Sequence, residues 1–381
     1  MTPLEGLLRQ RIAAEGALPV AQFMAAVLGH PEHGVYMQRD PLGQSGDFVT
    51  APEISQVFGE LIGAWCAAVW QMMGAPDPLP LVELGPGRGT LLADVWRTLN
   101  AVAKPMAAAL RLHLVESSPP LRTRQQATLA GLSPSVAATW HARADEGLAA
   151  LPDGPFILLA NEFFDALPIQ QFVRCEGAWH ERLIDVAPGG EGLSFVLGPA
   201  ADPPVELSFA ASARDGDILE LCPEAERLAG HIAARLAAPA SGCGSAALIV
   251  DYGPARSGFG DTLQAVGGHR IVDPLTAPGE ADLSHHVDFE RLRAAAERAG
   301  ARCFGPIAQG LFLCRLGAGV RADALAARAP SVEAADAIRG AVRRLVHPGR
   351  MGLLFKALAI TAPGMLSPPG FDPPAARRSA K

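Results

Sequence analysis

Residues 81–90 constrain the fold more than any other part of the chain. They read Leu-Val-Glu-Leu-Gly-Pro-Gly-Arg-Gly-Thr, an apolar run followed by three alternate glycines and then by a segment with helical spacing. Glycine has no Cβ, so the backbone can turn sharply there and let a ligand approach closely. A strand that enters a helix through such a turn is typical of the βαβ units of a parallel sheet.

Short apolar runs continue to alternate with helical segments from Leu79 onward. We therefore predict an α/β fold with a mostly parallel, seven-stranded sheet. Its strands are expected at Leu81–Leu84, Arg111–Val115, Val136–Trp140, Phe156–Ala160, Ala246–Val250, Cys303–Ile307 and Leu353–Ile360. The helices include Thr90–Asn100, Pro120–Ala130, Gln309–Leu316 and Val332–Leu345.

The remaining segments are expected to extend this core. Residues 1–78 read as an N-terminal helical extension, and Thr50-Ala51-Pro52-Glu53 looks like a capping box that starts a helix continuing to Val69. The main domain is expected at 79–362, with insertions at about 170–216, 252–287 and 308–350, the first being a small antiparallel sheet. Residues 363–381, rich in proline and small side chains, read as a flexible tail.

Composition narrows the class of protein. The 381 residues are 49% hydrophobic and 19% charged, a balance that suits a sizeable core. A net charge of −7 lacks the global basic footprint of a nucleic-acid binder. The six cysteines form no C-x-x-C pair, and no secretory signal, mitochondrial presequence or run of about 20 apolar residues is seen. We expect a cytoplasmic protein without membrane insertion.

The glycine loop restricts the ligand. A dinucleotide fingerprint needs G-x-G-x-x-G/A, but Thr90 follows Gly89, and a Walker loop would need a lysine that is missing. Gly85, Gly87 and Gly89 with an acid, Glu116, closing the second strand instead favour S-adenosylmethionine, because that carboxylate can accept hydrogen bonds from both ribose hydroxyls. Glu83 in the first strand suits the cationic methionine end of the same cofactor.

Four longer motifs give the chain a family resemblance. They are residues 46–60, 83–90, Asn161-Glu162-Phe163-Phe164-Asp165-Ala166-Leu167-Pro168, and the block formed by 260–263 and 287–289. Together they resemble the MidA-type methyltransferases, over roughly Leu4 to Ile360. The resemblance implies a class I, Rossmann-like methyltransferase fold that turns S-adenosylmethionine into S-adenosylhomocysteine. For the mitochondrial member it implies symmetric dimethylation of an arginine on a core complex I subunit.

Two departures from the family pattern bear on this chain. His285 precedes His286 where the family has a small variable residue, and we expect no mitochondrial presequence from the sequence as read. The second departure favours a bacterial protein whose substrate differs from the mitochondrial one.

Candidate catalytic residues follow the fourth predicted strand. Asn161, Glu162 and Asp165 stand where parallel sheets place catalytic side chains, and a carboxylate there can bind a guanidinium in bidentate fashion. Asn161 and Asp165 can also be explained as caps of the turn and of the next helix.

Other candidates lie on loops near the same edge. Asp47 and Glu53 are expected to line the cofactor pocket, Asp47 from a loop at 46–49 that covers the cofactor, although the capping box alone accounts for Glu53. Tyr252, Asp282 and His286 are expected in the substrate cleft. No metal is expected, because His285 and His286 lack the spacing of metal ligands.

Three functions stay open at the level of the sequence. A protein arginine N-methyltransferase with a protein substrate is favoured by the resemblance, and the protein substrate is the only macromolecular partner expected. A small-molecule O- or N-methyltransferase would use the same cofactor half. An assembly factor that binds the cofactor without turnover is the third, and the sequence leaves a homo-oligomer open.

Overall fold

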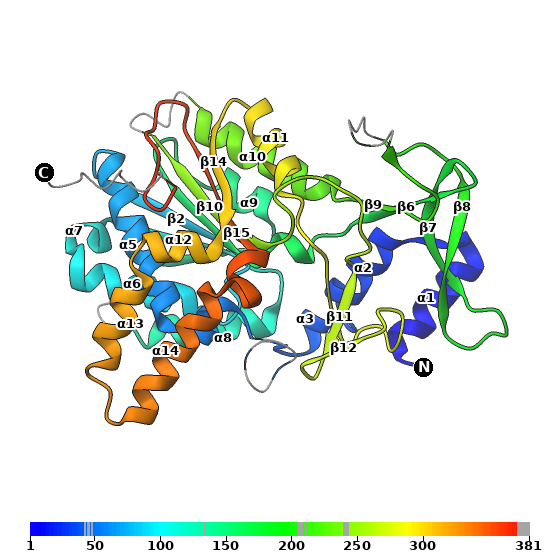
Figure 1. Cartoon of the computed structure of the whole chain (residues 1–381), viewed down its shortest axis with the longest axis horizontal. Helices are drawn as coiled ribbons and strands as arrows, with labels where there is room; N and C mark the ends of the chain where they lie inside the picture. The colour runs from blue at the N-terminus through cyan, green and yellow to red at the C-terminus, as the bar shows by residue number, and fades with distance from the viewer. Residues whose placement is uncertain are drawn as a thin grey trace, which may run out of the picture.

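The structure is a computed structural model, and it describes residues 1–41, 43, 46, 49–132, 135–204, 209, 212–238 and 244–371. Its centre is a seven-stranded sheet in the order β14-β15-β10-β5-β2-β3-β4 (Figure 1). The strands from β4 to β10 are parallel, and β15 runs antiparallel to both of its neighbours. The expected mostly parallel sheet is confirmed. The strands are β2 (Leu79–Leu84), β3 (Leu110–Val115), β4 (Ala138–His141), β5 (Ile157–Asn161), β10 (Ala246–Tyr252), β14 (Arg302–Ala308) and β15 (Phe355–Thr361).

The strand order reverses between β2 and β5. The chain leaves β2 for β3 and β4 on one side, then returns to add β5 and β10 on the other. The register places Leu84, the last residue of β2, beside Val115 of β3 and Ala160 of β5. Open α/β sheets bind ligands in the crevice at the carboxyl ends of strands beside such a reversal.

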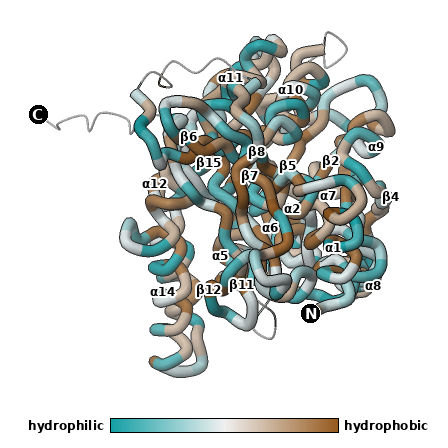
Figure 2. The backbone as a smooth tube through the Cα atoms, turned by 90° about the vertical axis from the view of Figure 1, so that its right-hand side faces the viewer, coloured by the Kyte–Doolittle hydropathy of each residue, from teal (hydrophilic) through white to brown (hydrophobic). Residues whose placement is uncertain are grey.

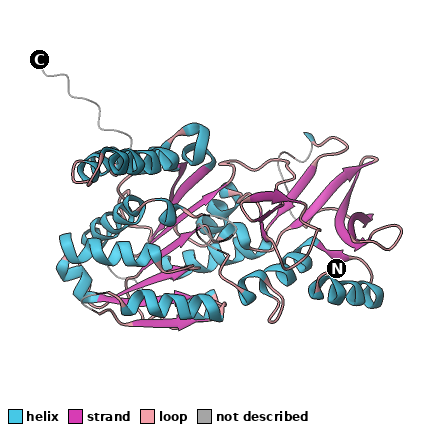
Figure 3. Ribbon diagram, turned by 90° about the horizontal axis from the view of Figure 1, so that it is seen from below, coloured by secondary structure: helices cyan, strands magenta, loops and turns pink. Residues whose placement is uncertain are grey.

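Helices cover both faces of the sheet (Figure 3). Strand side chains alternate between two cores, so Leu248 of β10 enters one while Ile249 enters the other. Helices of the first core are α5 (Gln56–Met72), α6 (Thr90–Val102), α7 (Lys104–Ala109), α8 (Pro119–Ala130), α12 (Gln309–Arg315), α13 (Ala318–Ala326) and α14 (Val332–Val346). Those of the second are α9 (Ala144–Ala149), α10 (Pro223–Ala237) and α11 (Phe289–Arg298).

The capping box expected at Thr50 is wrong. Thr50 makes no side-chain cap bond, and a short helix, α4 (Ala51–Ile54), ends before α5 begins. Ser55 caps α5 instead, with its hydroxyl accepting from the Val57 N–H. The Glu53 carboxylate accepts a hydrogen bond from the Thr90 hydroxyl instead.

A second part of the molecule is built around antiparallel strands. One sheet contains β1 (Leu18–Pro19), β6 (Gln170–Cys175), β7 (Ala178–Val186), β8 (Leu193–Ala200) and β9 (Ile218–Leu221). Another contains β11 (Gln264–Gly267), β12 (Arg270–Val272) and β13 (Asp282–Ser284). Figure 2 faces this part of the molecule, with β7 and β8 towards the viewer. The insertion expected at 252–287 is therefore a small sheet and its connections.

The N-terminal extension is divided between the two parts. The first three helices, α1 (Pro3–Glu15), α2 (Val20–Gly29) and α3 (Val35–Gln38), join the antiparallel part, where Phe23 and Met24 share a core with Ile184 and Leu283. By contrast, α5 packs against α6 on the main sheet. A single boundary at residue 78 therefore does not describe the fold.

The end of the described chain is packed, whereas the sequence suggested a flexible tail from residue 363. Met365 is buried, and the Phe371 ring lies 5.2 Å from that of Phe312. The Arg315 guanidinium also donates to the Gly370 carbonyl at 3.0 Å. The tail expectation is wrong as far as Phe371, and residues 372–381 lie outside the described part. No helix among the described residues is long and apolar enough to cross a membrane.

Candidate cofactor and acceptor site

The three alternate glycines adopt the backbone that the sequence requires of them. Gly85, Gly87 and Gly89 have φ values of 62°, 54° and 78°, in the left-handed region that disfavours other residues. A Cβ on Gly85 would lie 2.9 Å from Cδ2 of Phe163, so close packing as well as the turn excludes a side chain there. The loop therefore brings bare backbone to the N-terminus of α6.

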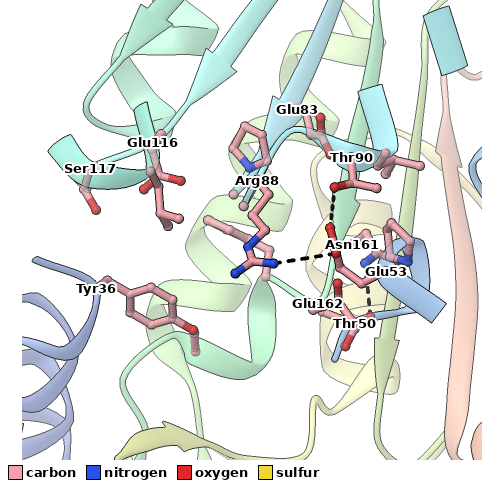
Figure 4. Close-up of a pocket in the computed structure, with 18 of the residues that line it drawn as sticks. Tyr36, Thr50, Glu53, Glu83, Arg88, Thr90, Glu116, Ser117, Asn161 and Glu162 are labelled. Atoms are coloured by element: carbon pink, nitrogen blue, oxygen red, sulfur yellow. Dashed lines mark hydrogen bonds and ion pairs between the residues drawn. The ribbon is translucent and has the colours of Figure 1, made fainter. Parts of the chain in front are cut away.

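A pocket opens beside this loop, and the space within it and at its solvent-facing mouth is about 930 Å³. It lies at the carboxyl ends of β2, β3 and β5, with α3 and α4 closing its sides (Figure 4). Its lining residues are Tyr36, Thr50, Pro52, Glu53, Glu83, Gly85, Pro86, Gly87, Arg88, Thr90, Leu91, Glu116, Ser117, Leu121, Asn161, Glu162, Phe163, Ala166 and Leu167.

Glu116 lies at the β3 side of the pocket in a fixed orientation. Its Oε1 accepts from the Ser118 N–H at 2.9 Å, and its Oε2 accepts from the Gln125 amide at 3.0 Å. The same Gln125 amide donates to the Gly87 carbonyl at 2.8 Å, which ties the acid to the glycine loop. Burial raises the pKa of Glu116. A carboxylate held in this way can accept hydrogen bonds from the two ribose hydroxyls, as expected from the sequence.

Two buried acceptor atoms line the pocket without a hydrogen-bond donor among the described residues. They are Oε2 of Glu83 and Oδ1 of Asn161. Burial, with the nearby Glu116 charge, raises the pKa of Glu83 to about 8. Buried acceptors left unpaired cost free energy, so they favour a ligand that brings donors. The α-ammonium of S-adenosylmethionine carries three N–H donors and a positive charge, and these residues therefore fit the cofactor.

Arg88 is the only lysine or arginine among the residues that line the pocket, and sequence reasoning overlooked it. Its Nε donates to Asp40 at 2.7 Å, and its Nη1 lies 3.9 Å from Oε2 of Glu53. Figure 4 shows its guanidinium reaching between Glu116 and Glu53. Its guanidinium and the N-terminus of α6 are the positively charged or polarised groups at this end of the pocket. The place of Arg88 inside the glycine loop is the sequence feature that could have identified it as a pocket residue.

Glu53 lines the pocket as expected, and it does so from α4. Its Oε1 accepts a hydrogen bond from the Thr90 hydroxyl, at the first residue of α6. Glu53 and Thr90 thus connect the N-terminal extension to the glycine loop. Asp47, the other residue expected here, lies outside the described residues.

Glu162 faces the pocket from the turn after β5. Its Oε1 accepts from the Ala51 N–H at 2.7 Å and from the Asn161 amide at 3.2 Å. Burial and the charge of Asp165 raise the pKa of Glu162 to about 7, although the Ala51 bond and the positive charge of Arg344 oppose this shift. This carboxylate is therefore placed opposite Glu116, with a pKa close to neutrality (Figure 4).

Four other predicted residues do not line the pocket. Asp165 is buried and bonded to the Tyr252 hydroxyl, Asp282 is bonded to the Tyr36 hydroxyl, and the His286 ring lies 5.6 Å from that of Tyr252. They form a polar cluster between the main sheet and β13, so their roles in catalysis and in the substrate cleft stay predictions. Tyr36 does line the pocket, but it precedes the glycine loop by about 50 residues and no motif marks it. No group of three metal-ligating side chains occurs in the described part of the chain.

Comparison with known proteins agrees with this geometry. A family model of S-adenosyl-L-methionine-dependent methyltransferases matches residues 61–307. The protein arginine methyltransferase NDUFAF7 homolog of Drosophila melanogaster is 40% identical, over 94% of this chain and 85% of its own length. Human NDUFAF7, also named a protein arginine methyltransferase, is 34% identical over 94% of this chain and 83% of its length.

A solved structure shares the whole fold. It is a methyltransferase-like protein from Burkholderia thailandensis bound to S-adenosyl-homocysteine, 26% identical, with a TM-score of 0.77. The similarity covers 97% of this chain and 92% of that one. These matches confirm the α/β methyltransferase fold, and the chain therefore belongs to the family of S-adenosyl-L-methionine-dependent methyltransferases that also contains the NDUFAF7 proteins.

Proposed function

We propose that this methyltransferase acts on the guanidinium group of an arginine in a protein. The observation that carries the proposal is Glu162, a carboxylate held at the pocket on the side away from Glu116. A guanidinium offers five N–H donors and a positive charge, which a fixed carboxylate can bind and orient. The names of the similar proteins, protein arginine methyltransferases, support the same acceptor.

The chain's own residues divide the work between cofactor and acceptor. When bound, S-adenosylmethionine supplies an electrophilic methyl group on its sulfonium. Glu116 would hold the ribose, Glu83 and Asn161 the ammonium, and Arg88 the carboxylate. Fixing both reactants in one pocket lowers the barrier, because orientation is established before the reaction.

Glu162 would hold the acceptor and receive its proton. A methylated guanidinium nitrogen must lose one proton for each methyl group gained, so a base has to stand near it. Because the pKa of Glu162 is raised to about 7, its carboxylate can accept a proton near neutral pH and then release it. Glu162 is therefore the catalytic residue of the proposal.

Labelled methyl transfer tests the proposed acceptor. The purified chain is mixed with tritiated-methyl S-adenosylmethionine and a lysate from cells that lack the gene. Label in a protein band that yields methylarginine on hydrolysis supports the proposal, and a respiratory complex I subunit is the first acceptor to examine. Label only in small metabolites supports a small-molecule methyltransferase, and no label supports a cofactor-binding assembly factor.

A further inference from the structure

Asp251 is the last residue but one of β10, and it lies under the turn that follows β5. It is fully buried, and its Oδ2 accepts from three consecutive backbone N–H groups: Phe163 at 3.1 Å, Phe164 at 2.9 Å and Asp165 at 3.3 Å. Its Oδ1 accepts from the Tyr252 N–H at 2.9 Å. One carboxylate therefore satisfies four backbone donors in a place that water does not reach.

The turn that Asp251 holds carries two residues of the pocket wall. Glu162 has a φ of 50°, a left-handed conformation that costs free energy for a residue with a side chain. Phe163 lies against Gly85 of the glycine loop. Phe163 of the turn thus touches the glycine loop, and the preceding residue, Glu162, directs its carboxylate into the pocket.

Nothing in the turn itself explains its conformation. The Glu162 N–H continues the sheet by donating to the Val250 carbonyl at 2.8 Å, and beyond that point the parallel ladder ends. Strained backbone persists only where its surroundings impose it, and here the next three N–H groups converge on one carboxylate oxygen. The position of Glu162 therefore depends on Asp251, a residue on another strand.

We propose that Asp251 is a positioning residue for methyl transfer, which acts through the turn at 162–165 to hold Glu162 at the acceptor side of the pocket. The inference rests on the proposed role of Glu162 as the residue that orients the acceptor. It does not depend on whether the acceptor is a protein or a small molecule.

The test substitution is Asp251→Asn, which keeps the volume of the side chain. An asparagine has one oxygen where aspartate has two, so its NH₂ group must face either Tyr252 N–H or the three N–H groups of the turn. The turn should loosen, and displacement by about 1 Å can reduce a rate by roughly a hundred-fold. We expect at least a ten-fold loss of methyl transfer with a smaller change in the affinity for S-adenosylmethionine.

A double-mutant cycle separates positioning from general loss of structure. Methyl transfer is measured for Asp251→Asn, Glu162→Gln and the double variant, as total label reaching any acceptor in the lysate. If Asp251 acts through Glu162, the double variant should be about as slow as Glu162→Gln alone. Once the charge of Glu162 has been removed, displacing that side chain causes no further loss. A purely structural role would make the two losses multiply.

Two further measurements keep the outcome interpretable. Asp288→Asn is the matched control, since Asp288 also accepts a backbone N–H, that of Arg291, but at the start of α11. It should leave methyl transfer unchanged. Hydrogen–deuterium exchange should show faster exchange at residues 163–165 in Asp251→Asn alone.

Normal transfer despite fast exchange, or losses that multiply in the double variant, would overturn the positioning role. Label that reaches only small metabolites would overturn the protein acceptor and leave the positioning role intact, and a wild type that labels nothing would overturn both.

Discussion

Glu116 and Gln125 share a hydrogen bond of 3.0 Å that joins the end of β3 to the middle of α8. The same Gln125 amide reaches the Gly87 carbonyl, and its side-chain oxygen accepts from the Trp140 indole N–H at 2.9 Å. The acid of the proposed ribose site and the glycine loop are thereby fixed relative to each other by a single buried side chain.

Removing the Glu116 carboxylate should weaken cofactor binding. In Glu116→Ala the ribose hydroxyls would lose a charged acceptor, at a cost of about 1.5–3 kcal/mol, or roughly ten- to a hundred-fold in affinity. Isothermal titration calorimetry with S-adenosylmethionine measures this directly. An unchanged dissociation constant would remove Glu116 from the ribose site.

Gln125→Leu should weaken cofactor binding less than Glu116→Ala does. The substitution keeps the Glu116 carboxylate but removes its hydrogen bond from Gln125, together with the bonds to Gly87 and Trp140, so the loss should be about 1 kcal/mol in binding. Because the two residues act together, the double variant should bind about as weakly as Glu116→Ala alone. Fully additive losses in calorimetry would show that Gln125 does not act through Glu116.

Gly85→Ala tests whether the glycine loop needs bare backbone. The new Cβ would meet Phe163, and alanine at a φ of 62° adds strain of about 1–2 kcal/mol. The matched control is Gly177→Ala in the β6–β7 turn, where φ is 74° and no atom lies within 4 Å of a Cβ. Both variants should be less stable in thermal unfolding, but only Gly85→Ala should lose cofactor affinity. Equal affinity in the two variants would contradict a cofactor role for the loop.

The residues proposed to hold the cofactor could be brought to one pocket from the sequence, because they sit next to strand ends. Gly85–Gly89 directly follow β2 and Glu116 directly follows β3, so the topology alone brings them together. Glu83 lies within β2, so it could be selected once that strand was predicted to be buried. For the same reason Asn161 and Glu162 were found from the end of β5.

The rest of the site depends on contacts that the sequence does not encode locally. Tyr36 arrives from the helical extension, and Asp251 acts on a turn about 90 residues earlier in the chain. The four-residue pattern at Thr50 suited a capping box, whereas in the structure Ser55 caps the next helix and Glu53 accepts from Thr90, 37 residues away in the chain. In the tail, proline content suggested disorder, but one apolar side chain, Phe371, packs on α12.

Cofactor affinity should rise with pH through the titration of Glu83. In the free protein its pKa is raised to about 8, so below that pH the side chain is mostly neutral and binds a cationic ammonium less well. Affinity should therefore fall by up to about ten-fold for each unit of pH below 8. Calorimetry on wild type and Glu83→Gln measures this, since the cofactor's own titration is common to both. Parallel pH profiles would contradict the assignment.

Folding stability should respond to the same group with the opposite sign. The pKa of Glu83 rises from 4.5 to about 8 on folding, so between these values the unfolded chain has released a proton that the folded chain still holds. The free energy of unfolding of the cofactor-free protein should then decrease with rising pH across that window, relative to Glu83→Gln. Chemical denaturation at several pH values provides the comparison.

Glu162→Gln should reduce methyl transfer without reducing cofactor affinity. The glutamine oxygen can still accept from the Ala51 N–H, so the turn and α4 keep their contact while the charge that orients a guanidinium is lost. A charge-assisted bond is worth about 1.5–3 kcal/mol, which predicts a rate roughly ten- to a hundred-fold lower. Glu146→Gln is the control, since Glu146 also accepts a backbone N–H, from Ala142, but on α9.

The pH profile gives the same substitution a second readout. Because the pKa of Glu162 is raised to about 7, transfer by the wild type should increase with pH up to about that value, where the carboxylate forms, and then level off. Glutamine cannot titrate, so at saturating S-adenosylmethionine, where the titration of Glu83 does not limit the rate, this limb should be absent in Glu162→Gln while the dissociation constant for S-adenosylmethionine stays the same. Near-normal transfer would reduce Glu162 to a structural residue of the turn. An equal loss of cofactor binding would place Glu162 in the cofactor half of the pocket and would contradict its assignment to the acceptor.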